Sequence, residues 1–135
     1  MSAESAVLAG RTAAESLMLD TCTIGRLDGT SSTDPNTGVV TPNSTPVYTG
    51  KCKVQVRTLV PRGQSAGETL VVETRPELHV PMSVIGLRTG DLATITTVDP
   101  VAGDPDLVGR VLRVEVPFHK SQATARRMPC TEGGV

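Results

Sequence analysis

The sequence predicts a mainly β protein: a small antiparallel β-barrel or sandwich with an N-terminal helix, extended loops and a C-terminal arm. Three observations favour this fold. Val and Thr are abundant, and β-branched residues favour strands. The 13 Gly and 10 Pro indicate many turns. Residues 90–116 have the pattern of a β-hairpin, because two Val- and Thr-rich stretches, 92–98 and 108–116, flank a turn rich in Asp, Pro and Gly.

A chain of 135 residues fits a single domain. We expect residues 1–18 to form the helix, residues 19–128 the barrel and residues 129–135 a flexible tail. No apolar run approaches the roughly 20 residues that span a bilayer, and the N-terminus lacks the pattern of a signal peptide. We therefore expect a protein made in the cytoplasm, without a membrane partner.

The N-terminal stretch has helical spacing. Ser2 suits the N-cap, and Val7, Ala14 and Leu17 fall on one face together with other small side chains. Such a face buries little area but permits close approach. Two interpretations stay open: the helix packs on its own sheet, or it docks on a neighbouring subunit, because an isolated helix of this length needs a partner surface.

Three strands are expected in the first half of the chain. Residues 19–28 alternate as a first strand, residues 28–38 form a turn, and residues 39–48 return antiparallel, with two prolines that favour an edge strand. Residues 48–59 alternate most clearly. The side chains expected to face the core are Cys52, Val54 and Val56, and those expected to face solvent or a partner are Lys51, Lys53, Gln55 and Arg57.

The second half begins with a polar loop at residues 61–68, followed by a strand at 70–80 that Pro76 interrupts. The hairpin at 90–116 comes next. A final strand is expected at residues 122–128.

The composition excludes several classes of function. With one Tyr, one Phe and no Trp, the chain lacks the aromatic faces on which sugars and single-stranded nucleic acids stack. A net charge of −1 also argues against tight binding of duplex DNA, which requires a basic excess.

No catalytic or metal-binding pattern is present. The three cysteines, Cys22, Cys52 and Cys130, lie too far apart in sequence for zinc ligation, and we expect them to be reduced and buried. A Cys hydrolase would need Cys52 or Cys130 beside His79 or His119 in space. We expect no enzyme activity and no cofactor.

Four sequence blocks occur together: SLMLDTCTIGR after the helix, VYTGKCKVQVR, the hairpin, and the tail SQATARRMPC. The most specific parts are D-P-x-L-x-G-R-x-x-R-V at residues 104–114 and A-T-A-R-R at residues 123–127. With these blocks the chain resembles the head-to-tail connector proteins of long-tailed bacteriophages, in particular the head-closure or stopper type of phages that infect actinobacteria.

The resemblance implies a β-barrel or sandwich that assembles as a homo-oligomeric ring of six-fold or twelve-fold symmetry in the neck of the virion. Such rings close the portal channel after DNA packaging and offer a docking surface for the tail. The implied partners are further copies of the chain, the portal or adaptor ring, the tail terminator or tail tube, and double-stranded DNA that passes without sequence-specific binding. The implied location is the virion, and the host cytoplasm during assembly.

Two groups of site residues follow. Family members extend a loop toward the channel axis, and the polar loop between strands is the candidate here: Pro61, Arg62, Gly63, Gln64, Ser65, Ala66, Gly67 and Glu68. The candidate contacts between subunits are Val7, Arg11, Ala14, Arg126 and Arg127. The two adjacent arginines can pair with acidic residues across a subunit boundary, or they can be solvated.

Three alternatives compete with the stopper interpretation. An adaptor or tail-completion protein belongs to the same connector, although adaptors of this kind are mostly helical. A small β-barrel that binds nucleic acid would need a basic, aromatic face. The Cys hydrolase is the enzymatic alternative.

Overall fold

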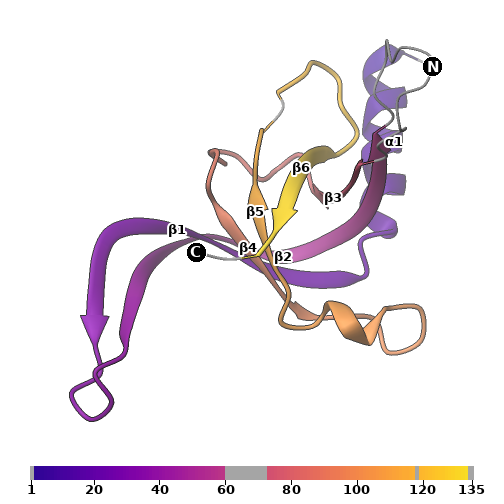
Figure 1. Ribbon diagram of the computed structural model, residues 1–135. Coiled ribbons are helices and arrows are strands. Elements are labelled where there is room, and N and C mark those ends of the chain that lie inside the picture. Colours follow the sequence, from indigo (N-terminus) through magenta and orange to yellow (C-terminus); the bar gives the residue numbers. More distant parts are fainter. Residues whose placement is uncertain (1, 60–72, 118, 134–135) are drawn as a thin grey trace, which may run out of the picture.

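The computed structural model describes residues 2–59, 73–117 and 119–133 (Figure 1). These residues form one α-helix and six antiparallel strands, which close into a barrel in the order β1-β2-β3-β6-β5-β4. The predicted mainly β fold is therefore confirmed. The elements are α1 (Ala3–Ser16), β1 (Asp20–Thr33), β2 (Val40–Leu59), β3 (Glu73–Val80), β4 (Leu92–Thr97), β5 (Val111–Val114) and β6 (Arg126–Glu132).

The core fills the barrel with alternate side chains of all six strands. Cys22 and Ile24 of β1 are fully buried, as the alternation predicted, and so is Cys52 of β2. Val54 is only half-buried and Val56 is exposed, so the predicted inward row of β2 ends early. Other buried residues are Leu78, Val80, Ala93, Ile95, Leu112, Val114, Met128 and Cys130. Closure of the barrel leaves it without a free edge.

The predicted hairpin is strands β4 and β5, which pair from Leu92↔Arg113 to Thr94↔Val111. The second strand is shorter than expected because the Asp- and Pro-rich connection has structure of its own. A 3-10 helix, η1 (Pro105–Leu107), begins after Asp104, whose carboxylate accepts a hydrogen bond from the Asp106 amide.

Strands β1 and β2 run on together beyond the barrel. We call residues 27–46 the ribbon; it projects at the lower left of Figure 1. The expected turn at 28–38 is wrong in its extent, since β1 continues to Thr33 and the turn tightens to residues 34–39. The strands expected at 39–48 and 48–59 are one continuous strand. Pairing with β1 carries β2 through Pro42 and Pro46, at an edge that no other described strand covers.

The C-terminal strand lies four residues later than predicted. Strand β6 begins at Arg126 and ends at Glu132, so the barrel does not end at residue 128, and residues 129–132 are strand rather than a flexible tail. The physical reason is that Met128 and Cys130 alternate into the core, opposite Leu78 and Val114 respectively. These two pairs bridge β3 to β5 and close the barrel.

Helix α1 begins after Ser2, whose hydroxyl accepts a hydrogen bond from the Ser5 amide at 3.2 Å, as the capping pattern predicted. None of its residues is buried. It touches the rest of the chain where a Cβ on Gly10 would lie 2.7 Å from Cγ2 of Thr124. Glu15 of the helix also forms an ion pair with Lys51, at 3.9 Å between Oε1 and Nζ. The helix therefore packs on its own chain through a few contacts and leaves Leu8 and Leu17 more than half exposed.

Candidate functional site

A groove of about 670 Å³ opens where the ends of β2 and β3 meet β6. The pairing register of the strands brings the lining residues of this groove together. His79 of β3 lies directly opposite Arg127 of β6, and β3 also pairs with β2. We call it the basic groove. Its lining residues are Gln55, Val56, Arg57, Glu77, His79, Met82, His119, Lys120, Ala123, Ala125, Arg126 and Arg127.

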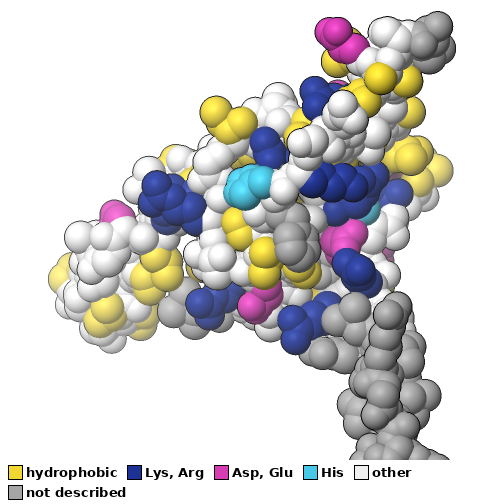
Figure 2. Space-filling view, turned by 90° about the horizontal axis from the view of Figure 1, so that it is seen from above, with side chains coloured by type: hydrophobic (Ala, Val, Ile, Leu, Met, Phe, Trp, Pro, Cys, Tyr) yellow, Lys and Arg dark blue, Asp and Glu magenta, His cyan; other side chains and the backbone are white. Residues whose placement is uncertain are grey.

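The basic groove carries four Lys or Arg side chains and a single carboxylate, together with two histidines. The carboxylate is already engaged: Glu77 Oε1 lies 2.7 Å from His79 Nε2, and Glu77 Oε2 lies 3.7 Å from Arg57 Nη1. Lys and Arg side chains gather over the body of the molecule, whereas the ribbon at the left shows mostly apolar and uncharged side chains (Figure 2). The groove can therefore accept an anionic partner.

Both predicted arginines, Arg126 and Arg127, line this groove, but they differ in how far their own chain holds their side chains. Arg126 is held by its own chain, because its guanidinium donates to the backbone carbonyls of Val84 and Met82. Arg127 is exposed and donates to the Thr124 hydroxyl at 3.2 Å. Arg127 is thus the member of the pair that remains accessible to a partner.

The predicted contacts on the helix lie elsewhere. Val7 and Arg11 line a shallow groove of about 300 Å³ beside α1, and Ala14 is half-buried outside it. Arg11 Nε donates to the Ala123 carbonyl at 3.0 Å, so this side chain attaches the helix to its own chain. The predicted channel loop, residues 61–68, lies outside the described residues.

The ribbon is the surface that the sequence reasoning missed. Its only charged residues are Asp28 and Asp34, and its tip exposes Val39 and Val40 by 58% and 59%. The sequence contains little signal for it, because the Ser- and Thr-rich stretches that flank Asp34-Pro35 lack any alternation of large apolar residues. A polar stretch without periodicity indicates a loop rather than paired strands.

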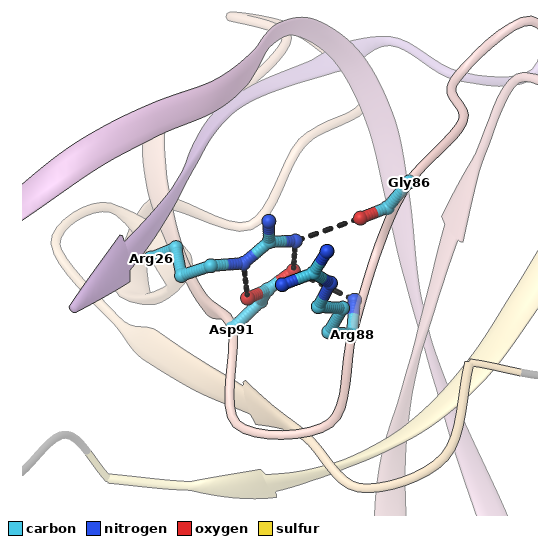
Figure 3. A network of polar contacts seen from close by, with 4 residues as sticks. All are labelled: Arg26, Gly86, Arg88 and Asp91. Atoms are coloured by element: carbon cyan, nitrogen blue, oxygen red, sulfur yellow. Dashed lines mark hydrogen bonds and ion pairs between the residues drawn. The ribbon is translucent and has the colours of Figure 1, made fainter. Parts of the chain in front are cut away.

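An ion pair between the half-buried Arg26 and the buried Asp91 fixes the root of the ribbon (Figure 3). Arg26 donates from Nε and Nη2 to the two carboxylate oxygens of Asp91, both at 2.9 Å, and also from Nη2 to the Gly86 carbonyl at 2.7 Å. The Asp91 carboxylate accepts a further bond from the Arg88 amide at 2.8 Å. The hydrogen bonds to Asp91 and its negative charge raise the pKa of Arg26. Because the bidentate pair is planar and directional, it orients the start of the ribbon relative to the turn before β4.

The cysteines do not provide an activated nucleophile. All three are free and buried. Burial raises the pKa of the Cys130 thiol to about 12, and a hydrogen bond with Cys22 together with burial raises that of Cys52. At neutral pH the thiols of Cys52 and Cys130 stay protonated, and the thiol is a poor nucleophile compared with the thiolate.

The described residues contain neither a cluster of metal-binding side chains nor a membrane-spanning helix. No group of three or more His, Cys, Asp or Glu side chains in them is placed to hold a metal ion. Of the helical segments that the structure describes, none has both the length and the apolar character needed to cross a bilayer.

A family model matches most of the chain. No curated protein matches the chain. The family described as "Family of unknown function (DUF6093)" matches residues 10–131. The matched part begins at Gly10 of α1, which faces Thr124, and ends at the penultimate residue of β6. The match includes the ribbon, the ion pair at its root and the basic groove. The chain therefore belongs to the DUF6093 family, a family of unknown function.

Proposed function

We propose that the protein is a structural component of the phage neck: a head-to-tail stopper that forms a ring, closes the portal channel after packaging and receives the tail. The observation that carries the proposal is the ribbon. A stable barrel with no free edge extends two of its own strands into solvent over 20 residues, 27–46, although the ribbon covers no part of the core. A segment ordered in this way is suited to contact with another molecule.

The placement of the projections also supports a connector. Helix α1 and the ribbon lie on opposite sides of the barrel (Figure 1). Each exposes apolar side chains, Leu8 and Leu17 on the helix and Val39 and Val40 on the ribbon. One projection can contact the head side, and the other can contact the tail side or a neighbouring copy. The net charge of −1 per chain keeps a ring of many copies from binding the passing DNA tightly.

A tail-completion protein of the same connector is the second candidate, and the same projections favour it. An adaptor fits less well, because the adaptor proteins of such connectors are mostly helical. The single described α-helix here buries none of its residues.

The test uses the phage that encodes the chain. We expect mass spectrometry to find the chain in purified virions, and we expect deletion of its gene to yield tailless heads that package DNA and then release it. Complementation from a plasmid should restore infectivity. Heads that keep their DNA but lack only the tail would favour the tail-completion function. Virions that lack the chain and remain fully infectious would contradict both.

A further inference from the structure

We infer that the ribbon of one copy seats in the basic groove of the next copy, so that the two surfaces together form a head-to-tail interface between identical chains. This inference rests on the proposed ring and names the contact that would build it. It assigns a partner to each of two surfaces that the described residues leave uncovered.

Charge complementarity favours this pairing. The ribbon carries two carboxylates, Asp28 and Asp34, and no Lys or Arg. Both carboxylates accept hydrogen bonds within the ribbon, from Thr30 and Asn36 respectively, and these bonds lower their pKa values, so both are ionised at neutral pH. The basic groove has four cationic side chains, of which Arg57 pairs with its one carboxylate, whereas Lys120 and Arg127 are exposed.

The apolar parts match as well. At the ribbon tip the Asp34 amide donates to the Val39 carbonyl at 2.9 Å, which holds the carboxylate beside two exposed valines. The groove has the corresponding composition: Val56, Met82, Ala123 and Ala125 supply apolar surface among the cationic side chains. Contacts that combine buried apolar area with complementary charge give both affinity and a defined register.

The geometry requires the two surfaces to belong to different molecules. Both lie on strand β2, which is continuous from Val40 to Leu59: the ribbon takes its first residues and the groove takes residues 55–57. Thirteen residues separate Pro42 from Gln55, which corresponds to about 40 Å along a strand. A copy therefore cannot place its own ribbon in its own groove. Because the two contact surfaces differ, repeated pairing propagates in one direction and closes as a ring when the rotation permits.

The root of the ribbon prepares it for docking. The Arg26–Asp91 pair orients the ribbon before it meets a partner, since Asp91 is 1% exposed and fixed by three donors. A surface that is already ordered loses less conformational entropy on binding.

Mixing two variants of the full chain tests the inference. In the first, residues 29–42 are replaced by Asn-Gly, which closes the shortened hairpin between Asp28 and Asn43 with a tight turn. In the second, Lys120→Glu and Arg127→Glu reverse two exposed charges of the groove. The control is Arg113→Glu, which reverses an exposed charge outside the groove.

Sedimentation velocity up to about 1 mM protein is the measurement. We expect the natural chain and the control to self-associate, more weakly at high salt, and each test variant alone to associate at least tenfold more weakly. An equimolar mixture should form a one-to-one dimer and nothing larger, because it contains one usable ribbon and one usable groove. Self-association of either test variant at the natural strength, or no association of the natural chain, would overturn the inference.

Two other outcomes separate this inference from its alternatives. If the groove variant loses affinity for a 30-base-pair DNA duplex but still self-associates like the natural chain, the groove is a nucleic-acid surface and the inference is wrong. If the mixed dimer forms but phage without the chain remains infectious, the inference stands and the proposed function fails.

Discussion

Strands β1 and β2 form two regions of opposite character (Figure 1). In the barrel they bury Cys22, Ile24 and Cys52 completely. In the ribbon the same two strands stay paired, with register shifts at Ile24/Gly25 and Leu27/Ser31, yet Val39 and Val40 at the tip are more than half exposed. Both regions are paired, and they differ most in burial. We conclude that the barrel supplies stability and that the ribbon is available for contact.

The largest expected effect tests whether the barrel, and not the ribbon, supplies the stability of the fold. Ile24→Ala removes buried methyl groups from the barrel and should lower the free energy of unfolding by about 2–5 kcal/mol. Val40→Ala in the ribbon should change it by less than about 0.5 kcal/mol. Urea unfolding followed by circular dichroism measures both. Similar losses for the two variants would mean that the ribbon also carries stability.

The junction between the two regions should show the next largest effect. Asp91→Ala leaves the Arg88 amide without its acceptor, which should cost about 1–3 kcal/mol. It also frees Arg26, so we expect faster amide hydrogen exchange in the ribbon than in strands β3 and β6. Equal acceleration in all strands would indicate a global loss of stability, and the ion pair would then have no specific role at the root of the ribbon.

Substitutions at the contact between helix α1 and Thr124 should have a smaller effect, which amide hydrogen exchange can measure. Gly10→Ala should gain helix propensity of about 1 kcal/mol, but its Cβ would collide with Thr124 Cγ2 at 2.7 Å. We expect the single variant to weaken protection of the α1 amides against exchange. Adding Thr124→Ser removes the methyl group and keeps the hydroxyl that accepts from Arg127, so protection should recover. Equal protection in both variants would show that the contact does not hold the helix.

The smallest expected effect concerns pH. The carboxylate of Asp34 in the ribbon tip accepts a hydrogen bond from the Asn36 amide, and that of Asp99 after β4 accepts two, from Ala102 and Val101. These bonds lower both pKa values. Because the folded pKa lies below the unfolded one, the stabilising contribution is present above about pH 4 and is lost as pH falls through the folded pKa.

Carbon-13 NMR of the carboxyl groups checks this expectation. The Asp34 signal should titrate below the ordinary value for Asp, near 3.9. Asp34→Asn is the control, because the amide oxygen can accept the same bond without titrating. A midpoint for Asp34 at or above 3.9 would contradict the turn geometry at the ribbon tip.

Most of the barrel could be predicted from sequence because burial leaves a pattern. The alternation of Cys22 and Ile24, the hairpin of β4 and β5, and the Ser2 cap all follow from local rules. The length of the ribbon could not be predicted in this way, because strands without a buried face show no alternation. Strand β6 was placed too early because Ala123 and Ala125 also alternate, but these small side chains are buried outside the barrel strands.

The basic groove lay beyond sequence reasoning for a different reason. Arg57, His79 and Arg127 come from three strands and meet only through the register of β2, β3 and β6. Sequence pattern assigned Arg57 to a row facing solvent or a partner and singled out Arg127, but nothing in it joined them. The charge of the groove is thus a property of strand order.

The most direct test of the division between barrel and ribbon is DNA retention by phage heads that carry the chain with residues 29–42 replaced by Asn-Gly. We predict that this variant unfolds at the same urea concentration as the natural chain, because the ribbon packs on no core. We also predict that filled heads assembled with it release their DNA. Heads that hold their DNA and accept tails as well as those with the natural chain would contradict the account.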